Sequence, residues 1–267
     1  MPPPQPAILF RDQRFAVLDK PPGLPVHAGP SGGRSVEDWF ALLSRRKDGP
    51  WLAHRLDADT AGCLVVALRR TALLEAQALF AAGRASKTYW AVVQGEVAGC
   101  AGTIDAPLLR TTSAAAGWRM TVDRHAGQSA ITDWRVLGRT TGRTWLELRP
   151  RTGRTHQIRV HCAVLGTPIL GDERYGTAGG GLHLLARSIH LPLNPPVEAT
   201  APPPAFMQAA LRQCGFDAMA GGTAPGAAQA KQPAKQSPAG KVTDPRFHVA
   251  MHTQIANDCP AQDPIDC

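Results

Sequence analysis

The sequence predicts an α+β fold with a mixed, largely antiparallel β-sheet flanked by helices. Segments with the composition of strands outnumber segments with helical periodicity along the 267 residues. The two kinds of segment do not alternate one for one, which a doubly wound parallel sheet would require. Two neighbouring segments, 129–138 and 144–150, both show the apolar–polar alternation of strands. These observations favour antiparallel pairing over a parallel sheet.

Three further segments are predicted strands. Residues 15–19 (FAVLD) are mostly apolar, and two prolines and a glycine soon after them end the strand. Residues 63–68 (CLVVAL) form a continuous apolar run of the length of a buried strand. Residues 87–97 (KTYWAVVQGEV) are rich in Tyr, Trp and Val, which are the residue types that pleated surfaces favour.

Three segments are predicted helices. Residues 35–43 place apolar side chains at the i, i+4 and i+7 spacing of one helix face. A second helix spans 71–83, with Thr71 as the expected N-cap and Gly83 as the residue that follows its C-cap. A third helix is expected within 154–166, where a glycine and a nearby proline end it.

Charge divides the chain into two regions. The formal net charge is +8, and residues 221–267 contain four basic and four acidic residues, so the whole excess belongs to 1–220. We expect 1–220 to form one domain with a surface that binds a polyanion such as nucleic acid. Residues 221–267 are rich in Gly, Ala, Pro, Gln and Lys without an apolar period, and we expect a disordered tail.

Several protein classes are excluded by composition. The six cysteines form no C-x-x-C pair, so neither a zinc ribbon nor a thioredoxin-type motif is predicted, and we expect no metal site. The N-terminus lacks the pattern of a secretory signal, and no apolar run reaches the roughly 18 residues that cross a bilayer. A cytoplasmic protein without a membrane partner is the resulting expectation.

The segment HRLDADTAG (54–62) concentrates charge ahead of a buried strand. A phosphatase-type D-x-D-x-T nucleophile does not fit, because the threonine comes one place early and the motif precedes the strand. A calcium loop does not fit either, because Leu68 stands where a bidentate glutamate is needed. Two interpretations remain open at this point. Asp57 is either a carboxylate presented beside Arg55, which would favour its ionised form, or part of an ordinary Asp/Thr turn.

The segment RPRTGRTHQIRVH (149–161) carries four arginines into the start of the third helix. Arginines beside the N–H groups of a helix N-terminus can bind phosphate, although a solvated basic face is an equally good interpretation. His156 and His161 do not share a helix face, and we interpret them as polar helix residues with local hydrogen bonds. In 87–92, Lys87 and Tyr89 share one strand face, where Tyr89 either stacks on a base or is half buried in the core.

Taken together and in this order, these segments resemble the pseudouridine synthases of the RluA type. The resemblance runs from ILFRDQRFAVLDKPPGLPVHAG through HRLDADTAGCLVVAL, KTYWAVVQGEV, GQSAITDWRVL and RPRTGRTHQIRVHCAVLGTPILGDERYG to LLARSIHLPL, and covers residues 8–193. It implies the pseudouridine synthase fold, a curved sheet with a central basic cleft. It also implies an enzyme that isomerises uridine to pseudouridine in structured RNA without a cofactor.

The resemblance also implies roles for individual residues. Asp57 is the expected catalytic nucleophile, and it attacks a nucleotide that has left the base stack. Arg159 is its expected salt-bridge partner, and Ile158 packs under the base. Tyr89 lies against the uracil and helps to remove the proton of carbon 5. Arg55 reaches into the RNA near the space that the nucleotide leaves, while Asp59 is a loop residue.

The expected partner is a structured RNA, either a tRNA or an rRNA stem-loop, and no obligatory protein partner is evident. Arg151 and Arg154 are expected RNA-binding residues. Many relatives carry a small RNA-binding domain ahead of the catalytic one, whereas the motifs here begin by residue 20, so binding is expected from the catalytic domain. The chain departs from the common T-S-G pattern at Ala61, and it has leucine at 185 where histidine is common.

Overall fold

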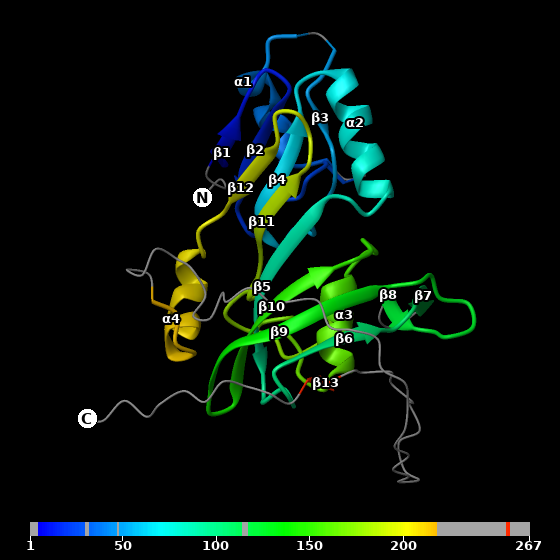
Figure 1. The fold of residues 1–267 in the computed structure, drawn as a ribbon, viewed down its shortest axis with the longest axis vertical. Coiled ribbons are helices and arrows are strands. Elements are labelled where there is room, and N and C mark those ends of the chain that lie inside the picture. Colours follow the sequence, from blue (N-terminus) through cyan, green and yellow to red (C-terminus); the bar gives the residue numbers. More distant parts are fainter. Residues whose placement is uncertain (1–4, 30–31, 47, 114–116, 218–254, 257–267) are drawn as a thin grey trace.

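A sheet of eleven strands forms the framework of the protein (Figure 1). The computed structural model describes residues 5–29, 32–46, 48–113, 117–217 and 255–256. The strand order is β1-β2-β4-β11-β5-β10-β9-β6-β13, with β3 paired to β4 and β12 paired to β11. Only the pair β4–β11 is parallel among the described strands. The predicted α+β class with a mixed, largely antiparallel sheet is confirmed. The strands of this sheet are β1 (Ala7–Arg11), β2 (Phe15–Lys20), β3 (Trp51–Leu52), β4 (Ala61–Ala67), β5 (Ser86–Gln94), β6 (Ala101–Asp105), β9 (Ile131–Thr140), β10 (Arg143–Pro150), β11 (Leu184–Leu191), β12 (Val197–Thr200) and β13 (Ile255–Ala256).

Helices cover both faces of the sheet. One face packs against α2 and α4, and the opposite face packs against a 3₁₀ turn, the short α1 that continues it, and α3. Figure 1 shows β5 running from the half of the sheet that carries α2 to the half that carries α3. The helices are η1 (Val36–Trp39), α1 (Phe40–Leu43), α2 (Arg70–Ala81), α3 (Gln157–Val164) and α4 (Ala205–Gln213).

Alternation along the central strand β5 explains why both faces need cover. Trp90 and Val92 are buried in the cluster under α2 and α4, whereas Ala91 and Val93 are buried in the cluster under α3. Successive side chains of a strand point to opposite faces, so a strand with apolar residues at every position must be covered twice. Tyr89 lies on the same face as Ala91, between the cluster of α3 and that of α1.

The helix boundaries differ in detail from those that the sequence predicts. The second helix begins at Arg70 with Arg69 as its N-cap, so the prediction of Thr71 was wrong. Gly83 follows the C-cap with a φ of 65°, as predicted. The third helix begins only at Gln157, because His156 before it has a left-handed backbone conformation. Residues 35–43 form a 3₁₀ turn before the α-helix, not one continuous α-helix.

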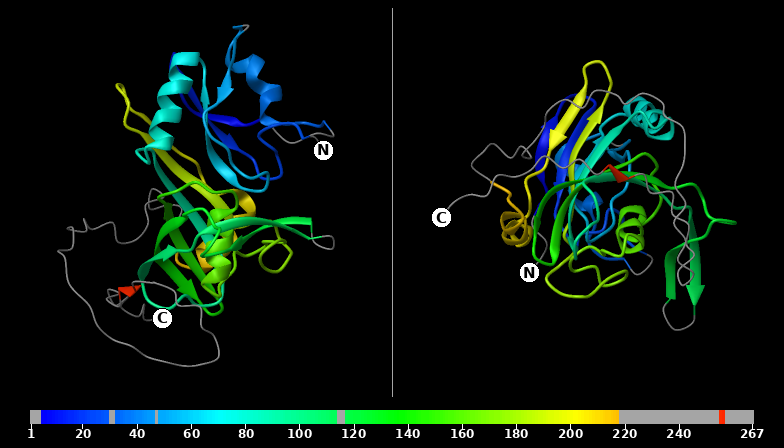
Figure 2. Two further views of the ribbon diagram at one scale, coloured as in Figure 1. Left: turned by 90° about the vertical axis from the view of Figure 1, so that its right-hand side faces the viewer. Right: turned by 60° about the horizontal axis from the view of Figure 1, so that its bottom comes forward.

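A two-stranded hairpin stands apart from the main sheet. It consists of β7 (Leu108–Ser113) and β8 (Gly117–Val122), and Figure 2 shows it projecting from the body of the molecule. The predicted disordered tail, 221–267, lies outside the described residues except for 255–256, which pair with β6. Within the described residues, no helix is long and apolar enough to cross a membrane.

Candidate active site

A cleft of about 1900 Å³ opens where the two halves of the molecule meet. Its walls come from the loop 53–60, the end of α2, the start of β5, the loop and first turn of α3, and the segments around 171–174 and 181–184. Three acidic residues line the cleft: Asp57, Asp59 and Glu173. The lining lysines and arginines are seven: Arg55, Lys87, Arg119, Arg151, Arg154, Arg159 and Arg174. This excess of positive charge suits a polyanionic ligand.

The loop that carries Asp57 is tied to the strand that follows it. Nε2 of His54 accepts a hydrogen bond of 3.0 Å from the N–H of Val65 in β4. Burial lowers the pKa of His54 to about 4, so the imidazole is neutral at pH 7 and can act as an acceptor. The N–H of Thr60 donates to the carbonyl of Asp57 at 3.1 Å and closes a turn. The turn interpretation of this segment therefore describes its backbone correctly.

Lys20 donates hydrogen bonds to the backbone of the same loop and of the segment that follows β2. Its side chain is fully buried, and Nζ donates to the carbonyls of Pro21 (2.9 Å), Leu24 (2.8 Å) and Ala58 (2.6 Å). Burial lowers the pKa of Lys20 to about 7, while the two carboxylates of the loop oppose this shift. The contact with Ala58 holds the backbone next to Asp57. Sequence reasoning did not assign Lys20 a function, although it lies in the segment ILFRDQRFAVLDKPPGLPVHAG, which carries part of the resemblance.

The packing around Ala61 and Gly62, which follow the loop, explains why their side chains are small. Gly62 has a φ of 107°, and a Cβ atom there would lie 2.3 Å from the carbonyl oxygen of Ala186 in β11. Only glycine allows β4 and β11 to approach so closely. Ala61 is buried in the apolar cluster under α2 and does not line the cleft. An apolar side chain fits that environment, so a serine hydroxyl is not needed there.

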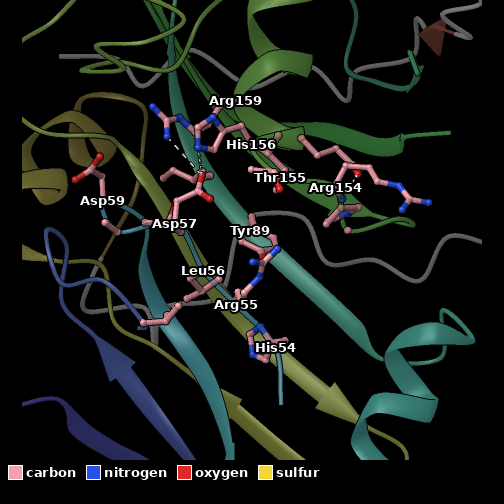
Figure 3. Close-up of a pocket in the computed structure, with 18 of the residues that line it drawn as sticks. His54, Arg55, Leu56, Asp57, Asp59, Tyr89, Arg154, Thr155, His156 and Arg159 are labelled. Carbon is pink, nitrogen blue, oxygen red and sulfur yellow. Dashed lines mark hydrogen bonds and ion pairs between the residues drawn. The ribbon is translucent and has the colours of Figure 1, made fainter. Parts of the chain in front are cut away.

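Asp57 projects into the cleft toward two side chains from the start of α3 (Figure 3). Nη1 of Arg159 lies 3.4 Å from Oδ2 of Asp57, and Nε2 of His156 lies 3.7 Å from the same oxygen. The carboxylate is 26% exposed, which leaves it accessible from the cleft. The loop and α3 are distant in sequence, since 102 positions separate Asp57 from Arg159. The fold thus brings together Asp57 and Arg159, which the resemblance predicts to form a salt bridge.

Arg159 is fixed by a second, fully buried carboxylate. Its Nε and Nη2 atoms donate to Asp172 at 2.9 and 2.8 Å, and the side chain of Asp172 is 0% exposed. Burial alone would raise the pKa of Asp172, but the hydrogen bonds and charge of Arg159 and two backbone N–H groups outweigh it and hold the pKa below its usual value. This two-fold contact leaves Nη1 of Arg159 for Asp57. Sequence reasoning missed Asp172, which lies in the quoted segment GDERYG.

His156 was interpreted wrongly as a helix residue with local hydrogen bonds. It precedes α3 with a φ of 53°, and its ring faces Asp57 and lies 5.0 Å from the ring of Trp118. A positive φ in a residue other than glycine has no signature in a helical pattern, which explains the error. His161 does lie in α3, as predicted, but its hydrogen bonds are not local, since its ring contacts Thr132 in β9 and the carbonyl of Ala106.

Tyr89, Ile158 and Arg55 line the cleft near Asp57. Tyr89 is partly buried, and burial together with the Asp57 carboxylate raises its pKa well above the usual value for a phenol. Ile158 is 7% exposed and packs into the cluster under α3. Arg55 is exposed at the cleft, and the arginine in contact with Asp57 within the described chain is Arg159, not Arg55.

The arginines of the α3 loop lie at the rim of the cleft. Arg151 donates from Nε and Nη2 to the two carboxylate oxygens of Asp133, both at 2.7 Å, and is largely exposed. Arg154 donates from Nε to the carbonyl of Ser129 at 3.1 Å, and Figure 3 shows its side chain directed away from Asp57. Gln157 organises this loop, because its side chain accepts hydrogen bonds from the loop and donates to β9.

Asp57 and Asp59 diverge. Figure 3 shows the carboxylate of Asp57 turned toward Arg159, whereas that of Asp59 points to the opposite side of the loop. Within the described residues, no group of three or more His, Cys, Asp or Glu side chains is arranged to hold a metal ion. The two aspartates therefore do not act as a pair on one ligand.

Comparison with known proteins identifies the family. The family model described as RNA pseudouridylate synthase matches residues 14–164. An uncharacterized RNA pseudouridine synthase of Zymomonas mobilis is 42% identical over 172 residues, which cover 64% of this chain and 78% of that protein. The ribosomal large subunit pseudouridine synthase D of Borreliella burgdorferi is 34% identical over 193 residues, which cover 69% of this chain and 59% of the relative.

A solved structure agrees with these relatives. That of the human RNA pseudouridylate synthase domain containing 4 is similar with a TM-score of 0.65 and 29% identity, over 78% of this chain and 92% of that one. The segments 54–62, 87–92 and 149–161, which resemble RluA-type enzymes, lie inside the region that the family model matches. The chain therefore belongs to the RNA pseudouridylate synthase family, in its RluA-type branch, and is an enzyme that isomerises uridine to pseudouridine in RNA.

Proposed function

We propose that this protein modifies specific uridines in a structured tRNA or rRNA stem-loop, with Asp57 as the nucleophile that attacks a flipped-out nucleotide. One observation carries the proposal. The carboxylate of Asp57 faces a basic cleft beside Arg159, whose own position is fixed by a buried ion pair. A carboxylate that is oriented by a neighbouring cation and accessible from the cleft can act as a nucleophile.

The chemistry that this site must perform is balanced without a redox step. The bond between N1 of uracil and C1′ of the ribose breaks, the uracil turns, and a bond forms between C5 and C1′. C5 then loses its proton, and N1, which carries no hydrogen in uridine, gains one, so atoms and electrons balance and no external oxidant or reductant takes part. In this reaction Asp57 attacks the flipped nucleotide and leaves again at the end of the cycle. The base must first leave its stack, at a cost of a few kcal/mol.

The neighbours of Asp57 supply the contacts for the flipped base. Ile158 offers an apolar surface beneath the uracil, and Arg55 is exposed where it can fill the vacated stack. Tyr89 lies against the uracil. Because burial and Asp57 raise the pKa of Tyr89, its phenol stays protonated at neutral pH and donates a hydrogen bond more readily than it removes a proton.

Arg151 and Arg154 contact RNA phosphates at the rim of the cleft. Both are exposed, and Arg151 already pairs with Asp133, so its contribution to affinity is expected to be the smaller of the two. The names of some relatives refer to the large ribosomal subunit, which makes an rRNA stem-loop a candidate beside tRNA. Some relatives are named as mitochondrial, whereas for this chain we propose action in the cytoplasm.

The experiment compares pseudouridine maps. RNA from a strain without this protein and from its parent is labelled with carbodiimide, which marks pseudouridine, and both tRNA and rRNA are mapped. We expect one or a few uridines to lose the label in the deletion strain, and their location identifies the substrate. Identical maps would reject the proposed function. Activity that vanishes with EDTA would instead favour a metal-dependent reaction.

A further inference from the structure

His156 approaches the Asp57 carboxylate, and the proposed reaction gives it no role. Its side chain is 9% exposed, and Nε2 lies 3.7 Å from Oδ2 of Asp57. Its left-handed backbone conformation, with a φ of 53°, is unfavourable for a residue with a Cβ atom. The contacts of the imidazole must therefore hold it in place.

A hydrogen-bond chain determines which nitrogen of His156 carries the hydrogen. The N–H of Met120 in β8 donates to the phenolic oxygen of Tyr175 at 3.0 Å. The same oxygen lies 2.8 Å from Nδ1 of His156. Since the phenol already accepts one bond, its own hydrogen is best placed on Nδ1, which then acts as an acceptor. The ring hydrogen therefore resides on Nε2 and points toward Asp57. The opposite tautomer would aim a lone pair at a carboxylate.

The surroundings favour the neutral imidazole. Burial lowers the pKa of His156, and the charges of Arg159 and Arg174 act in the same direction, while Asp57 and Asp172 oppose them. Within the described residues, these groups and the phenol of Tyr175 are the titratable and charged groups with a recorded interaction with the ring. A neutral ring keeps the single N–H that faces Asp57, and the distance of 3.7 Å makes this an interaction between dipole and charge in the free enzyme.

One buried carboxylate supports both side chains that face Asp57. Asp172 holds Arg159 directly, and its Oδ1 also accepts hydrogen bonds from the N–H of Tyr175 (3.1 Å) and of Arg174 (3.0 Å). The guanidinium of Arg174 lies 4.9 Å from the ring of Trp118, and that ring packs on the imidazole. The turn 172–176 and the hairpin β7–β8 thus close around the imidazole from two sides.

We propose that His156 is a positioning residue for the nucleophile, and that the hydrogen bond from Tyr175 to its Nδ1 directs its Nε2–H at Oδ2 of Asp57. Both Arg159 and His156 approach Oδ2, so Oδ1 is the oxygen left to attack the nucleotide. This role rests on the proposed function of Asp57. The hydrogen-bond chain begins at the N–H of Met120 in β8. The projecting hairpin is therefore linked to the nucleophile through Tyr175 and His156.

The first test measures the tautomer by ¹⁵N NMR of the histidine-labelled full chain, which needs no RNA. The expected result is a protonated Nε2 and an unprotonated Nδ1 for His156, and a mixture of tautomers in Tyr175→Phe. His161 is an internal control, because its bonds to Thr132 and to the carbonyl of Ala106 do not involve Tyr175. An Nδ1–H tautomer or an imidazolium at neutral pH in the wild type would overturn the proposal.

The second test uses single-turnover isomerisation of unmodified tRNA and rRNA transcripts, on whichever transcript the wild type modifies. His156→Gln keeps an N–H donor, whereas His156→Leu does not. Misplacement of a catalytic group by about 1 Å costs on the order of 100-fold in rate, and we expect a loss of this order in the Leu variant with an unchanged Kd for RNA. We expect the Gln variant to recover most of the rate. A wild-type rate in His156→Leu would overturn the positioning role, and a wild-type rate in Tyr175→Phe would overturn the part assigned to the hydrogen bond from Tyr175.

The two proposals fail in different ways. A wild type that modifies no transcript rejects the proposed function, whatever the tautomer of His156. An active wild type with an equally active His156→Leu variant rejects only the inference about His156.

Discussion

Replacement of Asp172 by asparagine tests the buried ion pair that holds the site together. Asparagine has nearly the same shape, and its oxygen can still accept from the backbone N–H groups that Asp172 Oδ1 accepts now. Its amide nitrogen, however, would face Nε–H of Arg159, a donor that now lies 2.9 Å from a carboxylate oxygen. The substitution therefore removes the charge and one acceptor but leaves the packing intact.

The expected loss of stability follows from burial. Removing one partner of a buried ion pair costs about 3–5 kcal/mol, because the remaining charge is left without compensation. Arg159 keeps its ion pair, at 3.4 Å, with the partly exposed Asp57, and its Nη2 can still donate to the oxygen at position 172, which places the expected loss near the lower limit. A loss of about 3 kcal/mol corresponds to a decrease in Tm of roughly 6–12 °C for a domain of about 200 residues.

Urea denaturation of the wild type and the variant measures this difference. The matched control is Asp133→Asn, which removes an equally two-fold ion pair with Arg151, but one whose side chains are 35% and 60% exposed. Surface pairs contribute about 0–1 kcal/mol, so the control should lose little. Equal losses in the two variants would refute the account of Asp172 as the support of Arg159.

The pH dependence adds an independent check. The folded-state pKa of Asp172 lies below its usual value, so the ion pair contributes its full stability above about pH 4 and loses it as the pH falls through the folded pKa. The difference in the free energy of unfolding between the wild type and Asp172→Asn should therefore become smaller as the pH falls. A gap that stays constant down to the acid transition would contradict this assignment.

Three further predictions concern the backbone, the pH profile and RNA affinity. Gly62→Ala should destabilise the protein far more than Gly142→Ala, because a Cβ atom at 62 would lie 2.3 Å from the carbonyl oxygen of Ala186, whereas nothing lies within 4 Å at 142. Similar midpoints of urea denaturation for the two variants would contradict this prediction. Burial lowers the pKa of His54 to about 4 in the folded protein, so the unfolded chain takes up the proton first as the pH falls. The contribution of the neutral His54 to the free energy of unfolding should therefore be lost between about pH 6.5 and pH 4. An NMR titration in which His54 has its ordinary pKa would disprove this prediction. Affinity for the RNA should fall by roughly a thousandfold between about 50 and about 200 mM salt if about six phosphates are contacted, and a flat response in a binding titration would exclude the basic cleft as the RNA site.

The sequence predicts local elements well where pattern and burial coincide. The strands around 15–19, 63–68 and 144–150 appear where alternation or an apolar run predicts them. The parallel pairing of β4 with β11 could not be predicted, because it joins residues more than 120 positions apart through backbone contacts. The hairpin β7–β8 also went unpredicted, since each of its strands has one buried residue and no regular alternation of buried and exposed positions.

The site shows the same division between local pattern and tertiary contact. Motif resemblance selected Asp57 and Arg159, and the fold brings them within 3.4 Å of each other. His156, Asp172 and Lys20 could not be assigned roles in the same way, because their functions depend on contacts between distant segments. A buried carboxylate or amine reveals its partner only when the chain has folded around it.

The most direct test of the account compares Asp57→Asn with Asp59→Asn in single-turnover assays. The two aspartates share one loop, but only Asp57 faces Arg159 (Figure 3). Both variants should bind the RNA as the wild type does. We predict that Asp57→Asn forms no pseudouridine while Asp59→Asn keeps a rate close to that of the wild type. Pseudouridine formation at the wild-type rate by Asp57→Asn would contradict the assignment of the nucleophile.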